Sequence, residues 1–202
     1  TFSSRGLGDV YKRQVDIRLS GYDVQKLKEL KISINEHLKK YIYDNGYKNI
    51  ENIVIDNLHK ENLTLSTAES CTGGLIGHRL TQVSGSSAVY AGGVISYSNE
   101  SKIDQLNVNP DNIKNFGAVS EEVAIEMAQN VKEKFNSSIG VSVTGIAGPD
   151  GGSEAKPVGL VYVGYCDEKL SFVQKFNFSS NRQANKIRTS QAVLKLILSN
   201  NN

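Results

Sequence analysis

The feature that most constrains the fold of this chain is a short apolar strand that runs through a Gly-Gly turn into an amphipathic helix. The stretch Thr64–Gly74 reads TLSTAESCTGG, and its leucine and small residues are typical of a buried strand. The next segment has apolar residues at Ile76, Leu80 and Val83, which is helical spacing. Ser70 is therefore predicted where a strand ends and a helix begins. Unpaired N–H groups at a helix start favour an alkoxide, an oxyanion or a phosphate, and a serine that only caps the helix explains the same residues.

The rest of the chain alternates strands with helices and ends in a hairpin. Further strands are predicted at 89–97, 139–144, 158–165 and 170–178. The first of these is expected to be central in the sheet. Ser98 and Ser120 are placed to cap helices, and Pro110 marks a loop between them. This order predicts an α/β domain, a three-layer α/β/α sandwich whose mixed sheet is parallel first and antiparallel towards the end.

The N-terminal 49 residues differ from this pattern. Residues 1–14 have no periodicity and resemble translated cloning sequence, so we expect a non-native leader there. Residues 15–49 predict one strand and one helix with a single apolar stripe, a small and partial α+β linker region. One strand cannot cover that stripe. The main domain is predicted over residues 50–202, after the polar turn near Asn49.

Composition excludes several classes of function. A formal net charge of +2 over 202 residues is too small to indicate binding to nucleic acid or to a membrane surface. No apolar run approaches the roughly 20 residues that span a bilayer, and no signal peptide is visible. Two cysteines and three scattered histidines predict neither a disulfide framework nor a metal site. We expect a cytoplasmic protein without metal or cofactor.

Three loops are expected to meet at one edge of the sheet, because ligands bind beyond the carboxyl ends of parallel strands. They are the Ser70 turn, the segment Tyr97–Lys102 and the loop Gly145–Gly152. None contains a histidine, so a Ser-His-Asp triad is not indicated. Lys102 can serve as the base if burial keeps it neutral, or it is simply a solvated lysine. Cys71 is a rival nucleophile or an ordinary buried cysteine.

The glycine-rich loop Gly145–Gly152 lacks the signatures of a P-loop and of a dinucleotide fingerprint. It can form a backbone nest for a phosphate or carboxylate, with the Thr144 hydroxyl and the Lys156 charge, or it is a long mobile turn. Three cations near the last helix can meet a phosphate or form a solvated face: Arg182, Lys186 and Arg188. The residues alone thus predict a small-molecule site with a Ser–Lys nucleophile and an anion cradle.

Three segments together resemble the C-terminal domain of CinA, the nicotinamide-nucleotide amidohydrolase family. They are Ala68–Gly74, Gly93–Lys102 and Val143–Gly152, and the motifs Gly117–Ser120 and Lys156–Gly159 fit as well. The resemblance covers about residues 63–199. It implies hydrolysis of the carboxamide of nicotinamide mononucleotide to nicotinate mononucleotide and ammonia, in the recycling of pyridine nucleotides.

The resemblance also implies roles for individual residues. Ser70 would be the nucleophile, activated by Tyr97 and Lys102. The nucleotide would be held by residues of the first and third loops: Glu69, Cys71, Thr72, Gly73, Gly74, Thr144, Gly145, Gly148, Gly151 and Gly152. Residues 15–49 are similar to the region that follows a larger N-terminal domain in this family, and we expect that domain to be missing. A homo-oligomer is expected.

Two other functions stay open at this point. One is a non-catalytic nucleotide-binding module of a competence- or DNA-damage-associated protein, which would need the Gly145–Gly152 loop but not Ser70 together with Lys102. The other is a Ser–Lys hydrolase that acts on a different amide or ester.

Overall fold

The computed structural model of the chain describes residues 17, 19–39, 42 and 48–200. The chain divides into two compact units, residues 1–50 and 51–202. In the first unit, helix α1 (Val24–Leu38) begins after Asp23, whose side chain accepts a hydrogen bond from the N–H of Lys26 at 3.0 Å. The expected leader lies outside the described residues, as does half of the strand expected at residues 15–20.

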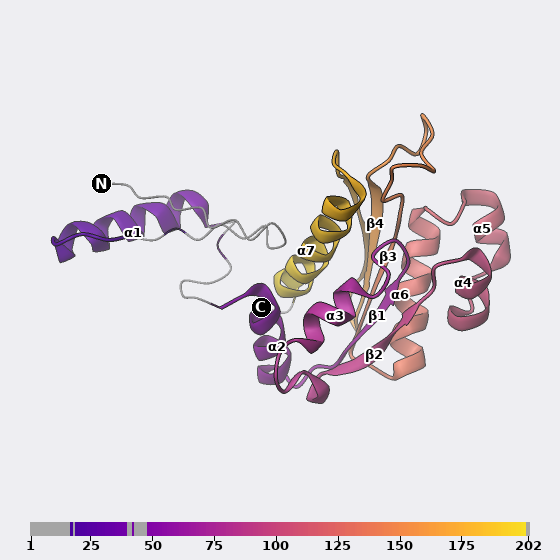
Figure 1. Cartoon of the computed structure of the whole chain (residues 1–202). Helices are drawn as coiled ribbons and strands as arrows, with labels where there is room; N and C mark the ends of the chain where they lie inside the picture. The colour runs from indigo at the N-terminus through magenta and orange to yellow at the C-terminus, as the bar shows by residue number, and fades with distance from the viewer. Residues whose placement is uncertain (1–16, 18, 40–41, 43–47, 201–202) are drawn as a thin grey trace. The chain divides into compact units, whose positions relative to one another are not determined.

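The second unit is built on a five-stranded sheet with the order β2-β1-β3-β4-β5 (Figure 1). Its strands are β1 (Leu65–Glu69), β2 (Tyr90–Ile95), β3 (Ile139–Gly145), β4 (Leu160–Cys166) and β5 (Ser171–Asn177). β1 pairs in parallel with β2 and with β3, whereas β4 is antiparallel to both β3 and β5. The predicted mixed sheet and its C-terminal hairpin are confirmed.

Helices cover both faces of this sheet. They are α2 (Ile50–Lys60), α3 (Leu75–Thr81), the 3₁₀ helix η1 (Ser86–Ala88), α4 (Asn99–Leu106), α5 (Pro110–Phe116), α6 (Glu121–Phe135) and α7 (Arg182–Asn200). α2, α3 and α7 lie on one side, and α4, α5 and α6 lie on the other (Figure 1). The three-layer α/β/α architecture predicted from the sequence is therefore confirmed.

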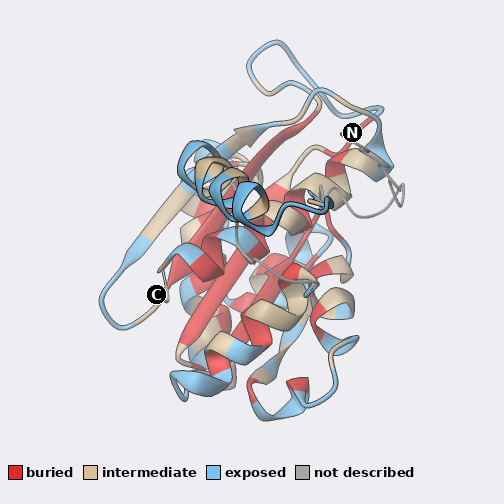
Figure 2. Cartoon of the chain, turned by 90° about the vertical axis from the view of Figure 1, so that its left-hand side faces the viewer, coloured by how far each residue is buried: buried red, intermediate tan, exposed pale blue. Residues whose placement is uncertain are grey.

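The core lies between the central strands and these helices, as the buried residues in Figure 2 show. Every residue of β1 and β4 is buried, because both faces of these strands are covered. α6 packs very closely on the sheet: a Cβ added to Gly164 would lie 2.4 Å from the carbonyl oxygen of Ala124. Only glycine permits that approach, which seats the buried stripe Val123, Met127 and Val131 of α6 in the core.

Two predictions about secondary structure are wrong. The strand predicted at 89–97 is not central: β2 pairs only with β1 and forms an edge of the sheet, and its residues alternate between half-buried and exposed. The segment was predicted to be a central strand because its glycines carry no polar side chain, as is also true of the residues of a buried strand. Pro110 does not mark a loop but begins α5, after Asn109 caps the helix through Asp111 N–H. Proline suits that first helical position because its missing N–H would be unpaired there anyway.

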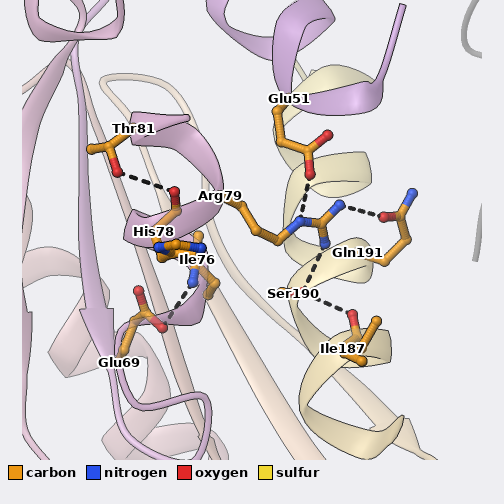
Figure 3. Close-up of polar contacts among 9 residues, drawn as sticks. All are labelled: Glu51, Glu69, Ile76, His78, Arg79, Thr81, Ile187, Ser190 and Gln191. Atoms are coloured by element: carbon orange, nitrogen blue, oxygen red, sulfur yellow. Dashed lines mark hydrogen bonds and ion pairs between the residues drawn. The ribbon is translucent and has the colours of Figure 1, made fainter. Parts of the chain in front are cut away.

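Arg79 links the helices on one side of the sheet (Figure 3). Its Nε lies 2.6 Å from Oε1 of Glu51 in α2, and its other nitrogens donate to Ser190 Oγ and Gln191 Oε1 in α7, both at 2.7 Å. The two charged side chains are only 14% and 12% exposed. Removing one partner from such a nearly buried ion pair destabilises the fold more than removing one partner from a solvent-exposed pair.

We expect Arg79→Met to destabilise the second unit by about 2–4 kcal/mol, because it leaves the Glu51 carboxylate half of a nearly buried pair without its partner. Urea denaturation followed by circular dichroism measures the change. Lys134→Met, on an exposed position of α6, is the matched control. A loss below about 0.5 kcal/mol, the size typical of surface substitutions, would contradict the structural role of this network.

Candidate active site

The parallel pairing of β2, β1 and β3 places their carboxyl ends at one edge of the sheet. Ser70 directly follows β1, and its N–H donates to the carbonyl of Val143 in β3 at 3.0 Å. On the other side, the N–H of Ser96, after β2, donates to the carbonyl of Glu69 at 2.9 Å. The three loops expected to meet at this edge therefore begin side by side.

Lys102 lies against Ser70 although the two residues are 32 positions apart. Its Nζ is 3.1 Å from Ser70 Oγ, and the lysine is 2% exposed. α4 positions it, because Ser98 caps that helix by accepting the N–H of Ser101 at 3.0 Å. Three backbone carbonyls surround the same nitrogen: that of Ser96 at 2.9 Å and those of Tyr97 and Ser98 at 3.4 Å.

This environment suits a neutral amine. Burial of Lys102 lowers its pKa below the ordinary value of 10.5, while Cys71 and the exposed Glu100 act in the opposite direction. No carboxylate forms an ion pair with Lys102 in the described part of the chain. A neutral amine has two N–H groups, enough for the Ser96 carbonyl and one of the two more distant carbonyls, and one lone pair for the Ser70 hydroxyl. The geometry therefore fits a serine nucleophile with lysine as its base.

Cys71 is a poor rival nucleophile. Its thiol is free and buried, and burial raises its pKa to about 12. The thiolate is the nucleophilic form of cysteine. At neutral pH almost none of it would be present here, so the alternative that Cys71 attacks the substrate loses support.

Glu69 has a structural role at the start of α3, and the substrate-binding role predicted for it stays a prediction. Glu69 is 1% exposed, and its carboxylate accepts the N–H group of Ile76 at 3.1 Å (Figure 3). It also accepts the N–H groups of Gly74 at 3.0 Å and Gly77 at 2.8 Å. These are amides of the α3 start, which no earlier carbonyl of the helix can reach. The protein's own carboxylate thus occupies the positive end of this helix.

The remainder of the Ser70 turn is tightly constrained. Gly74 has φ 91°, and a Cβ added there would lie 2.9 Å from Cδ1 of Ile95. Thr72 is fully buried, and its Oγ1 has no hydrogen-bond partner among the described residues. Since Glu69 takes the helix amides, the N–H groups of Cys71 and Thr72 are left nearest to Ser70 as candidate donors to an oxyanion.

Tyr97 is near this pair by its backbone, but its side chain points elsewhere. It is 58% exposed, and its hydroxyl accepts a hydrogen bond from Nη2 of Arg182 at 2.6 Å. Nη1 of the same arginine donates to the carbonyl of Gly148 at 2.9 Å. Arg182 therefore joins the second and third loops, and in this geometry Tyr97 does not relay a proton between Lys102 and Ser70.

The third loop is anchored at several points. Thr144 is 1% exposed, and its hydroxyl donates to the carbonyl of Ala118 at 2.6 Å. Nζ of Lys156 donates to Val119 at 2.7 Å and also bonds the carbonyl of Phe116. The Lys156 charge expected in the anion cradle is thus held at the α5–α6 turn. Gly145 ends β3, and Gly151 and Gly152 lie in the exposed part of the loop.

One residue of the loop's anchorage was not singled out from the sequence. Asn185 in α7 is 1% exposed, and its Nδ2 donates to the carbonyls of Ala147 at 3.0 Å and Ser180 at 2.9 Å. An asparagine among the buried positions of a helix is the signal that could have identified it.

No cluster of three or more His, Cys, Asp or Glu side chains that could hold a metal ion occurs in residues 17, 19–39, 42 and 48–200. Within the same ranges, no helix has the length and hydropathy required to cross a bilayer.

Comparison with known families agrees with the motifs around Ser70. A family model described as the CinA C-terminal domain matches residues 47–200. The chain belongs to the CinA C-terminal domain family. The family resemblance predicted from the sequence is thereby confirmed.

Curated CinA relatives are longer than this chain. A CinA-like protein from Kosmotoga olearia is 47% identical over 163 residues, which is 81% of this chain and 39% of that protein. A CinA-like protein from Cytophaga hutchinsonii is 42% identical over 191 residues, or 91% of this chain and 46% of that protein. The chain thus spans less than half the length of these relatives.

Solved CinA structures share the fold. The competence/damage inducible protein CihA from Agrobacterium tumefaciens aligns with a TM-score of 0.73 and 34% identity, covering 79% of this chain and 100% of that one. A CinA superfamily protein from Escherichia coli aligns with a TM-score of 0.72 and 26% identity, covering 82% and 98%. The α/β architecture is therefore that of known CinA-family structures.

Proposed function

We propose that this CinA domain hydrolyses the carboxamide of nicotinamide mononucleotide, giving nicotinate mononucleotide and ammonia. The observation that carries the proposal is the 3.1 Å contact between Ser70 Oγ and Nζ of Lys102. Lys102 is buried, and no carboxylate among the described residues forms an ion pair with it. The substrate follows from the resemblance of the three loops around that contact to the amidohydrolase family.

In the first half of the reaction, Lys102 Nζ takes the proton of the Ser70 hydroxyl while Oγ attacks the amide carbon. The tetrahedral oxyanion is held by the N–H groups of Cys71 and Thr72. Lys102 then returns the proton to the departing nitrogen, the C–N bond breaks, and ammonia leaves. An ester between Ser70 and the pyridine carboxyl remains.

In the second half, a water molecule takes the place of ammonia. Lys102 accepts a proton from this water as its oxygen attacks the ester carbon. The proton passes to Ser70 Oγ as the ester bond breaks, and nicotinate mononucleotide is released. One water is consumed and one ammonia is formed, so the reaction requires no cofactor in its balance.

A substrate panel tests the proposal against the two alternatives. Ammonia release is measured with nicotinamide mononucleotide, nicotinamide riboside, free nicotinamide and asparagine. The proposal predicts the highest kcat/KM for the mononucleotide. Faster release from another amide would favour a different Ser–Lys hydrolase, and nucleotide binding without ammonia release from any compound would favour the non-catalytic binding module.

A further inference from the structure

Two cations lie one helical turn apart on α7, beside the Ser70 turn. A Cβ added to Gly73 would lie 3.7 Å from Nζ of Lys186, so the half-buried Lys186 reaches over the glycines that follow Ser70. Arg182, four residues earlier, bonds the hydroxyl of Tyr97 and the carbonyl of Gly148. All three loops of the site therefore have one of these two cations next to them.

Neither cation is neutralised by the protein. The acceptors of Arg182 are uncharged, and neither it nor Lys186 forms an ion pair with a carboxylate in the part of the chain that the structure describes. Like charges four residues apart on a helix destabilise it. A loss of helix stability of this kind is expected at the edge of a functional site, where a bound ligand supplies the opposite charge.

Two other places for an anion near Ser70 are already filled. The start of α3 holds the Glu69 carboxylate, which would repel a second anion. Lys156 is held by the carbonyls of Phe116 and Val119. Ammonium groups bind phosphate through charge-assisted hydrogen bonds. Lys186 faces the Ser70 turn, and its ammonium group forms no ion pair with a carboxylate among the described residues.

We propose that Lys186 recognises the phosphate of the substrate, with Arg182 adding positive charge, so that a 5′-phosphorylated nucleoside amide is selected over its unphosphorylated form. The inference rests on the proposed function and deepens it. It places the amide at Ser70 and the phosphate at α7, which is one of the two places for a phosphate that the residues alone left open, the other being the Gly145–Gly152 loop.

The test compares nicotinamide mononucleotide with nicotinamide riboside, which differ only in the phosphate. For Lys186→Gln we expect kcat/KM on the mononucleotide to fall on the order of 10- to 100-fold, mainly through KM, as the loss of one charged hydrogen bond predicts. Activity on the riboside should stay unchanged. Lys186→Arg keeps the charge and should retain most of the preference for the mononucleotide.

Lys134→Gln, which removes an exposed lysine of α6, is the matched control. Equal losses on both substrates, or no loss on the mononucleotide, would overturn the role of Lys186. If the wild-type chain hydrolysed neither substrate, the proposed function would fail instead. Calorimetric affinities of the same variants for the two compounds would then decide the phosphate contact separately: a lost preference in Lys186→Gln supports it, and an unchanged preference overturns it.

Discussion

Replacing Ser70 with alanine is expected to lower kcat for nicotinamide mononucleotide by about 10⁴-fold or more, as loss of a nucleophile does in serine hydrolases. Among the described residues, the substitution removes the only hydroxyl oxygen within hydrogen-bonding distance of Lys102 Nζ. It leaves the Glu69 cap and the Gly-Gly turn intact. Initial rates of ammonia release measure the effect, and calorimetry should show nucleotide affinity within about threefold of wild type, because uniform binding is not removed.

Cys71→Ala is the control for this prediction. Burial raises the pKa of its thiol to about 12, so almost no nucleophilic thiolate is present at neutral pH. We therefore expect kcat to stay within about tenfold of wild type, which corresponds to about 1.4 kcal/mol of activation free energy. If Ser70→Ala remained fully active while Cys71→Ala lost activity, the nucleophile would be the cysteine and the Ser–Lys mechanism would be wrong.

Lys102→Met is expected to have the second largest effect, a loss of about 10²- to 10⁴-fold in kcat, the usual contribution of a general base. Methionine fills a similar volume but has no amine. Lys102→Arg should be similarly impaired, because a guanidinium stays protonated and cannot accept the Ser70 proton. Thermal denaturation of both variants shows whether the fold is kept. A fully active Lys102→Arg variant would exclude Lys102 as the general base.

The pH dependence of the wild-type chain provides a second test of Lys102. Only the neutral amine is a base, so kcat/KM should rise with pH as Lys102 loses its proton. Since burial lowers the Lys102 pKa, this rise should lie below pH 10.5. The residual rate of Lys102→Met should lack that rise. If wild type and Lys102→Met showed the same rise of kcat/KM with pH, the rise would come from the titration of another group.

Much of the fold followed from local sequence signals. The Gly-Gly turn after a strand of small residues, and the capping serines Ser98 and Ser120, fixed the main elements around the site. The position of 89–97 in the sheet did not follow, because a glycine-rich run has the same composition at an edge as in the centre. Pro110 was ambiguous for a similar reason, since proline occurs both in loops and at the first position of a helix.

The site was predictable as a set of loops but not as a set of contacts. That Lys102 meets Ser70 depends on the parallel pairing of β1 with β2 and on where α4 begins after Ser98, which no single motif specifies. The structural role of the Glu69 carboxylate could not be predicted, because its hydrogen bonds to three α3 amides depend on how the turn folds. The outward direction of the Tyr97 hydroxyl was likewise invisible in the sequence.

The most direct test of the account is to incubate the purified wild-type chain and Ser70→Ala with nicotinamide mononucleotide in excess chelator, and to measure ammonia and nicotinate mononucleotide together. The account predicts equal amounts of the two products from the wild-type chain and background levels from Ser70→Ala. Equal rates from both proteins, or no products from a wild-type chain that still binds the nucleotide, would contradict it.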